Sequence, residues 1–299
     1  MKSALSLLSC AVLCAWSCAR GGDPPGTSTA LEIPDAEAPA DLAGFFEAAG
    51  EGGLAEVNAG LKAHPEWAVA KDDRGMTALH FAAIHGDAST ATLLLSKGAA
   101  VDAENGVGWT PLLFAARDGR LAVAETLLES GADPDAAASQ GARAIHLLAR
   151  KGSLELARRL VEQGADPEAL DDGGTSALYF AATNGHAEMT AWLLSLGVEV
   201  DAQDAGGKTS LHGAAFDGHV ATLELLADAG AALDSKDGGG ETPLHYAAGQ
   251  AHLAAVTFLV DRGADAAVVD DYGTTPLGSA RRAGKDAGAP GSVEVGARS

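Results

Sequence analysis

Histidines are the residues of this 299-residue chain best suited to metal binding or proton transfer, and there are nine of them. An imidazole ligates metals and titrates near neutral pH, but a site needs several such groups converging on one point. Only His64 and His85 lie outside a 33-residue register; the other seven share two positions, His80, His146, His212 and His245, and then His186, His219 and His252. Residues that recur in this way fall in successive layers of a repeated structure, so we predict structural roles for them.

Acidic residues also recur in this register. One position holds Asp72, Asp171, Asp204, Asp237 and Asp270, and another holds Asp102, Asp135, Asp201 and Asp234. A ladder of calcium sites is one interpretation. The favoured one is that an aspartate before a glycine-rich turn accepts hydrogen bonds from its own backbone.

Gly207-Lys208-Thr209 is similar to the end of a phosphate-binding loop. That motif requires glycine five residues before Gly207, where Ala202 stands, and it lies between a strand and a helix. No Ser-His-Asp order, carboxylate pair or zinc spacing is present in the sequence. We therefore predict no catalytic residue, no metal site and no cofactor.

The composition narrows the function classes further. A net charge of −21 argues against a nucleic-acid partner, because phosphate recognition depends on clustered Lys and Arg. Apolar residues make up 47% of the chain and aromatic residues only 5%, so Ala, Leu and Val must build the core. Such small side chains are typical of closely stacked helices.

The N-terminus predicts export. Lys2 precedes an apolar run over residues 4–16, which is too short to span a bilayer and is typical of a signal peptide. All three cysteines lie here, and Cys18 follows a small residue, Ser17, as in a bacterial lipoprotein signal, although Ala15 replaces the usual Leu. The alternative is cleavage after Ala19. We favour a signal peptide over 1–18, lipidation of Cys18 and a flexible linker over 19–40.

This prediction places the protein at the periplasmic face of a bacterial membrane, with the outer membrane favoured and a soluble periplasmic or secreted form as the alternative. A lipid anchor would then be its contact with the membrane. We expect a monomer.

The histidines and aspartates belong to a repeated unit that must position them. Each copy has glycine two residues before a helix-starting residue, and these starts are Thr77, Thr110, Arg143, Ser176, Thr209, Thr242 and Thr275. This spacing predicts an N-terminal cap over 41–71, six full repeats over 72–269, a truncated C-terminal cap over 270–284 and a disordered tail over 285–299. In the cap, residues 41–49 and 54–61 are the expected helices.

The repeat over 237–269 shows the local logic. Residues 237–240 supply a turn, Thr242 caps a helix, and Pro243 fits its first position, where an N–H is not needed. A second helix over 252–260 ends at Gly263 in a left-handed cap. Neither short helix can bury its apolar face alone, so the repeats must stack.

Thr242-Pro243-Leu244-His245, and residues 206–215 followed by Gly218-His219, resemble the ankyrin repeat family. The resemblance covers about 41–284 and implies an all-α fold, a solenoid of helix pairs joined by hairpin turns. The departures are Arg143 for the capping Thr, Leu113, Tyr179 and Gly278 for the motif His, and Ala251 for the Gly between helices. From the missing cap we expect Arg143→Thr to stabilise the array by ~1 kcal/mol.

The resemblance also implies a non-catalytic scaffold that binds a protein through its concave face. Trp109 and Phe216 are candidate apolar anchors, unless they fold over a neighbouring repeat, and Trp192 is expected in the core. Arg117, Arg150 and Lys151 form a basic spot suited to an acidic partner surface. The alternative is a small-molecule or metal-binding protein, or a small enzyme, that uses the groove. The implied partner-binding residues are Arg74, Met76, Trp109, Arg117, Asp118, Arg150, Lys151, Thr183, Asn184, Lys208, Phe216, Asp217, Gln250 and Tyr272.

Overall fold

The computed structural model describes residues 36–284. The chain divides into two units, Met1–Pro34 and Asp35–Ser299, and the described residues lie in the second. The predicted signal peptide, Cys18, the tail and most of the linker therefore fall outside the described residues. The last part of the linker, residues 36–40, is not helical, and Pro39 lies close to Gly60.

Fifteen α-helices make up the regular structure between residues 36 and 284, with two short 3-10 helices, Pro65–Val69 and Ser139–Gly141. This confirms the all-helical solenoid. The α-helices are α1 Leu42–Glu51, α2 Leu54–Ala63, α3 Ala78–His85, α4 Ala88–Ser96, α5 Pro111–Asp118, α6 Leu121–Glu129, α7 Ala144–Lys151, α8 Leu154–Glu162, α9 Ala177–Thr183, α10 Ala187–Ser195, α11 Ser210–Asp217, α12 Val220–Asp228, α13 Pro243–Gly249, α14 Leu253–Asp261 and α15 Pro276–Arg282.

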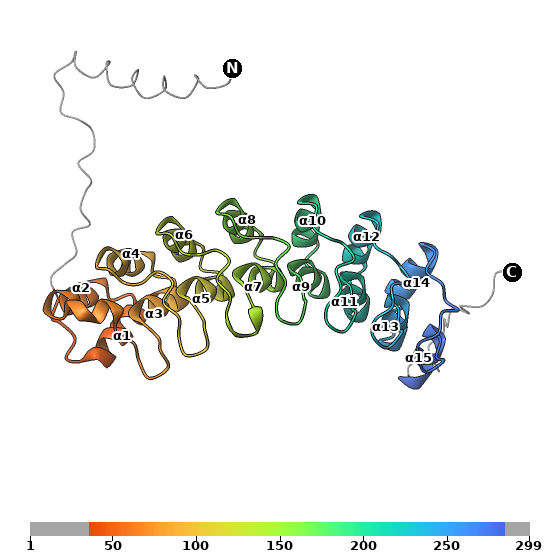
Figure 1. Cartoon of the computed structure of the whole chain (residues 1–299), viewed down its shortest axis with the longest axis horizontal. Coiled ribbons are helices and arrows are strands. Elements are labelled where there is room, and N and C mark those ends of the chain that lie inside the picture. The colour runs from red at the N-terminus through yellow and green to blue at the C-terminus, as the bar shows by residue number, and fades with distance from the viewer. Residues whose placement is uncertain (1–35, 285–299) are drawn as a thin grey trace, which may run out of the picture. The chain divides into compact units, whose positions relative to one another are not determined.

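The helices lie in two rows (Figure 1). Each odd-numbered helix contacts the next along the first row, from α1 to α15. Each odd-numbered helix from α1 to α13 also pairs with the even-numbered helix that follows it. Hairpin loops extend from the first row, on the side away from the second (Figure 1). We call the hairpin tips and the exposed side of the first-row helices the inner surface. Among residues 36–284, no helix has the length and apolar character needed to cross a membrane.

The core is a stack of equivalent layers. One leucine or isoleucine position of the first-row helix is at most 1% exposed in six repeats, at Leu79, Leu112, Ile145, Leu178, Leu211 and Leu244. One turn later stands alanine in five of these six, fully buried in each, and its small volume lets adjacent helices approach closely. Trp192 is 7% exposed, which confirms its predicted place in the core.

Glycines between the paired helices take a left-handed conformation that permits close contact with the next repeat. Gly185 has φ 71°, and a Cβ atom added there would lie 2.6 Å from Nδ1 of His219. Only glycine both adopts this backbone conformation without strain and leaves room for the His219 ring. Ala251 takes the same conformation with φ 58°, so the departure at this position leaves the turn unchanged and places an alanine in a backbone region that it disfavours.

The repeat over 138–170 has the most irregular hairpin. Ala138 replaces the turn aspartate or asparagine of the other repeats, and Gln140 has a positive φ of 69°. Arg143 lacks an acceptor for capping. It donates instead from Nε to the Asp135 carbonyl at 3.2 Å and from Nη1 to the Leu170 carbonyl at 2.7 Å. Arg143 therefore ties two turns together, which the expectation of a simple missing cap did not include.

Candidate partner-binding surface

The motif histidines link each repeat to the next. Nδ1 of His80 accepts a hydrogen bond from the Thr77 N–H at 3.0 Å, and Nε2 lies 2.9 Å from the Trp109 carbonyl. A backbone N–H only donates and a carbonyl only accepts, so the proton belongs on Nε2 and the ring is neutral. The same arrangement recurs at His212 and His245. His146 accepts from the Arg143 N–H in the same way, but its Nε2 lies 2.9 Å from the Ala169 carbonyl, at the end of its own repeat.

Burial lowers the pKa of His80, His146 and His212 and favours this neutral form. The second set of histidines lies at the start of second-row helices, where Nε2 of His186 lies 3.0 Å from the Arg150 carbonyl. The predicted structural role is confirmed for both sets. Protonation of His80 would place a donor on Nδ1, opposite the Thr77 N–H, where an acceptor is needed. The motif histidines are therefore poor proton carriers.

The aspartates likewise support the backbone. Asp237 Oδ1 accepts from the Gly239 and Glu241 N–H groups at 2.9 Å, as predicted for the turn. The second set corrects our prediction, because its carboxylates reach the next repeat: Asp102 accepts from the Asp133 N–H at 3.1 Å. Asp135, Asp201 and Asp234 do the same. Between residues 36 and 284, no three His, Cys, Asp or Glu side chains are placed to hold a metal ion.

Lys208 and Thr209 also have structural partners. The Lys208 N–H donates to Asp204 at 2.8 Å, and the Thr209 hydroxyl lies 2.9 Å from Nδ1 of His212. The Lys208 ammonium lies 5.3 Å from the centre of the Tyr246 ring. Both residues therefore belong to a hairpin and a helix start, and the preceding segment is a turn instead of the strand that a phosphate-binding loop requires.

A row of aromatic residues runs along the inner surface, and our sequence analysis missed it. Phe81, Phe114, Phe180 and Tyr246 share one position of the first-row helix and, apart from the buried Phe114, are half-buried. Cations lie over three of these rings: Arg74 at 6.0 Å from Phe81, Arg117 at 4.8 Å from Phe114 and Lys208 over Tyr246. The 33-residue period of the aromatic residues was the signal that could have revealed the row.

Trp109 packs on its own repeat and remains partly exposed. Its ring lies 5.1 Å from that of Phe114, and the Arg117 guanidinium lies 5.7 Å from its centre. Arg117 is held in turn by two hydrogen bonds to Asp118, of 2.8 and 2.7 Å. These bonds lower the pKa of the Asp118 carboxyl. The Trp109 face is therefore rigid, and an intramolecular partner already compensates the charge of Arg117.

The predicted basic spot forms only in part. Lys151 Nζ donates to the Arg117 carbonyl at 3.2 Å, which brings the two repeats' cations together. Arg150 is exposed and makes no ion pair within residues 36–284. Because Asp118 neutralises Arg117, Arg150 and Lys151 supply the charge that remains available to a partner.

The other predicted residues lie in different surroundings. Met76 is 5% exposed beneath the Asn105 side chain; this corrects the prediction that it contacts a partner, because a buried side chain cannot do so. Arg74 pairs with Asp72 at 3.1 Å, and Tyr272 is 83% exposed at its hairpin tip. Thr183 is half-buried and Gln250 partly exposed, whereas Asn184, Asp217 and Phe216 are exposed.

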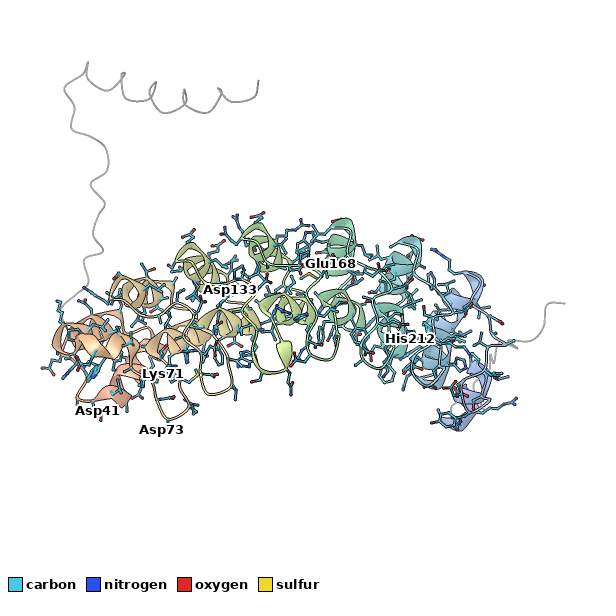
Figure 2. The ribbon with its side chains drawn as sticks, in the orientation of Figure 1. Asp41, Lys71, Asp73, Asp133, Glu168 and His212 are labelled. Carbon is cyan, nitrogen blue, oxygen red and sulfur yellow. The ribbon has the colours of Figure 1, made fainter. Side chains whose placement is uncertain are left out.

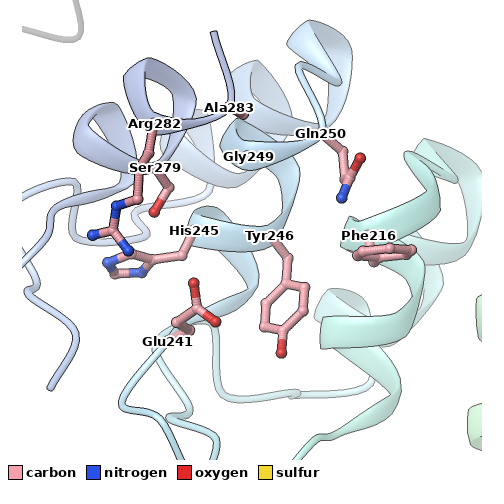
Figure 3. Close-up of a pocket in the computed structure, with 9 residues that line it drawn as sticks. All are labelled: Phe216, Glu241, His245, Tyr246, Gly249, Gln250, Ser279, Arg282 and Ala283. Carbon is pink, nitrogen blue, oxygen red and sulfur yellow. The ribbon is translucent and has the colours of Figure 1, made fainter. Parts of the chain in front are cut away.

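A hollow of about 390 Å³ opens on the inner surface at the last two repeats (Figure 3). It lies over Gly249, which occupies the same repeat position as Arg117, Arg150, Phe216 and Arg282. Its lining residues are Phe216, Glu241, His245, Tyr246, Gly249, Gln250, Ser279, Arg282 and Ala283. Phe216 and Gln250 were predicted from their repeat positions, but the hollow was not, because an absent side chain makes it.

Figure 2 shows how side chains cover both helix rows across the described residues, with His212 inside the first row. A family model of three ankyrin repeats matches residues 45–138, 145–237 and 211–289. A search of curated proteins found no match. The repeat geometry and the extent of this match show that the chain belongs to the ankyrin repeat family.

Proposed function

We propose that this chain is a non-catalytic scaffold that binds a protein partner on its inner surface, at the repeats over 105–170. Ankyrin repeats are generally protein-interaction modules. In this chain the partner would place an apolar group against Trp109 and an acidic group near Arg150 and Lys151. The observation that carries the proposal is a rigid, partly exposed indole, with two exposed cations in the following repeat, one of which contacts the Arg117 carbonyl.

Rigidity favours binding at this place. Phe114 and Arg117 already hold the Trp109 ring, so a partner would lose little conformational entropy in ordering it. Aromatic anchors at the centre of an interface commonly supply most of its binding energy. Arg117 supports the ring, and its bonds to Asp118 keep its own charge from requiring a partner.

Charge favours selection of an acidic partner. In a chain with net charge −21, most of the surface repels an acidic protein. Two exposed cations on one patch would therefore orient such a partner and set the salt dependence of its association.

The test uses charge reversal. A double variant, Arg150→Glu with Lys151→Glu, should abolish capture of partners from an extract of the source cells, whereas a Glu155→Lys variant on α8 should not. Adding Arg117→Glu would also release Asp118 and loosen the Trp109 ring. Undiminished capture of the same proteins by the double variant would contradict the proposal.

We further propose that the protein is exported and anchored through a lipid on Cys18, on the sequence pattern alone. Metabolic labelling with an alkyne-bearing fatty acid should mark the full chain but not Cys18→Ala. Equal labelling of both would contradict lipidation at this residue.

A further inference from the structure

We propose that the hollow over Gly249 is a second anchor site, which takes one apolar side chain of a protein segment with a carboxylate beside it. This inference rests on the proposed function, since it assumes that the inner surface binds a protein. It names a place and a chemistry that are separate from the Trp109 patch.

The hollow exists because one side chain is missing from a row. The equivalent positions carry Arg117, Arg150, Thr183, Phe216 and Arg282, and Gly249 falls between the last two. A Cβ atom added to Gly249 would have one neighbour within 4 Å, Cβ of Ser279 at 3.9 Å. The space above Gly249 can therefore accept a side chain, and no residue between 36 and 284 fills it.

One wall of the hollow is aromatic and fixed. Phe216 is 42% exposed, and its ring meets that of Tyr246 nearly edge to face at 5.9 Å. The Tyr246 hydroxyl donates to Asp237 at 2.7 Å, and Lys208 lies over the ring. Figure 3 shows the two rings near each other among the residues that line the hollow. This wall suits an aliphatic or aromatic side chain and needs little ordering on binding.

The opposite wall carries Arg282, which is ion-paired with the buried Asp270 but has unused hydrogen-bond donors. The Arg282 guanidinium makes no hydrogen bond within residues 36–284, and Nη2 lies 3.7 Å from Oδ2 of Asp270. That distance permits ionic attraction but no hydrogen bond. Arg117, at the same repeat position, already makes two bonds to Asp118. Arg282 can therefore donate to an incoming carboxylate in the two-bond geometry that guanidinium groups favour.

Glu241 determines where that carboxylate can lie. It lines the hollow, and Figure 3 shows it between His245 and Tyr246. A second negative charge there would be repelled, whereas Arg282 attracts one at the other end. The occupant that fits both ends has its apolar group against Phe216 and Tyr246 and its acidic group at Arg282.

The test selects peptides from a random phage-displayed library against the full-length protein. Selected peptides should contain an aromatic or aliphatic residue next to Asp or Glu. Gly249→Leu, which fills the hollow, should weaken their binding about tenfold or more, and Arg282→Gln should weaken it severalfold. Thr92→Leu, which adds an apolar side chain on α4 in the other helix row, should leave binding unchanged.

Misfolding would not explain a loss of peptide binding by Gly249→Leu. Gly249 is the last residue of α13 and does not have a positive φ, so leucine fits the backbone there. Replacing glycine in a helix tends to stabilise the helix. The thermal unfolding midpoint of Gly249→Leu should therefore equal or exceed that of the wild type.

Peptides that bind Gly249→Leu as well as the wild type would overturn the inference. If the Arg150→Glu, Lys151→Glu variant weakens those same peptides, the proposed function stands and the second anchor alone fails. Peptides sensitive to neither change would contradict both. Binders that appear only after removal of residues 285–299 would assign the hollow to the chain's own C-terminal segment, and so overturn a partner as its occupant.

Discussion

Leu211 and Leu277 occupy the same position in two repeats, but only Leu211 is enclosed. Leu211 on α11 is fully buried, whereas Leu277 on α15 is 42% exposed. α11 contacts α9 on one side and α13 on the other, while α15 has α13 as its first-row neighbour within residues 36–284. The contribution of a repeat position to stability therefore depends on the two repeats beside it, as expected for an array in which each unit contacts only the adjacent ones.

The same two regions differ in their polar groups. Arg117 in an interior repeat is held by Asp118 and lies over two aromatic rings. Arg282 in the truncated repeat keeps its donors available beside an empty space. The same repeat position therefore supports the fold at Arg117 and leaves hydrogen-bond donors unused at Arg282.

The largest expected effect separates the two leucines. Leu211→Ala should lower the free energy of unfolding by about 3 kcal/mol, because it removes buried apolar surface and leaves a cavity. Leu277→Ala should cost less than about 1 kcal/mol, because much of that side chain already contacts water. Urea denaturation followed by circular dichroism measures both. Equal losses would mean that α15 is covered in solution by a segment or a partner.

A smaller effect should appear with pH, and it should come from the interior repeats. Burial lowers the pKa of His80, His146 and His212 in the folded chain. As the pH falls through the ordinary histidine pKa of about 6.5, these residues therefore take up protons in the unfolded chain before they do so in the folded chain. Stability is therefore full above that pH and declines as the pH falls toward the folded-state pKa. Urea midpoints between pH 7 and 5 should record the decline.

His212→Leu gives the matched comparison, since Leu113 naturally occupies the equivalent position. This variant should lose stability at pH 7 but show a weaker pH dependence than the wild type. Above pH 5, the change in stability also reports on the imidazoles and not on the carboxyls of Asp72 and Asp237. Desolvation raises the pKa of these two carboxyls, but hydrogen bonds outweigh it, so both lie below their ordinary value. An unchanged pH profile in His212→Leu would count against the assignment.

The smallest effect concerns the helix starts. Arg143 in an interior repeat bonds to carbonyls of two turns, whereas Thr275 in the last repeat accepts only from the Gly278 N–H of its own helix. Arg143→Thr would gain a cap but lose both bonds, for a net loss of about 1 kcal/mol. This reverses the direction expected from the sequence. A raised urea midpoint would show that capping outweighs the link between turns.

The fold could be predicted because each repeat carries its own local signals. The capping threonines, the left-handed glycines and the apolar positions act within about a dozen residues, so the periodic sequence predicts helix pairs and their stacking. The site was harder to predict. Met76 was expected at the surface from its repeat position, but it is buried beneath Asn105 of the next repeat. The second set of aspartates was expected to bond locally, but it bonds to the following turn.

The sequence by itself therefore determined the architecture and the structural role of the histidines, because these depend on short-range chemistry repeated at a constant interval. The tertiary structure decided which side chains remain available. Asp118 neutralises Arg117, Phe114 supports Trp109, and the absent side chain of Gly249 opens a space between Phe216 and Arg282. These outcomes depend on what adjacent repeats place beside one another, and burial and charge compensation are properties of neighbours in space.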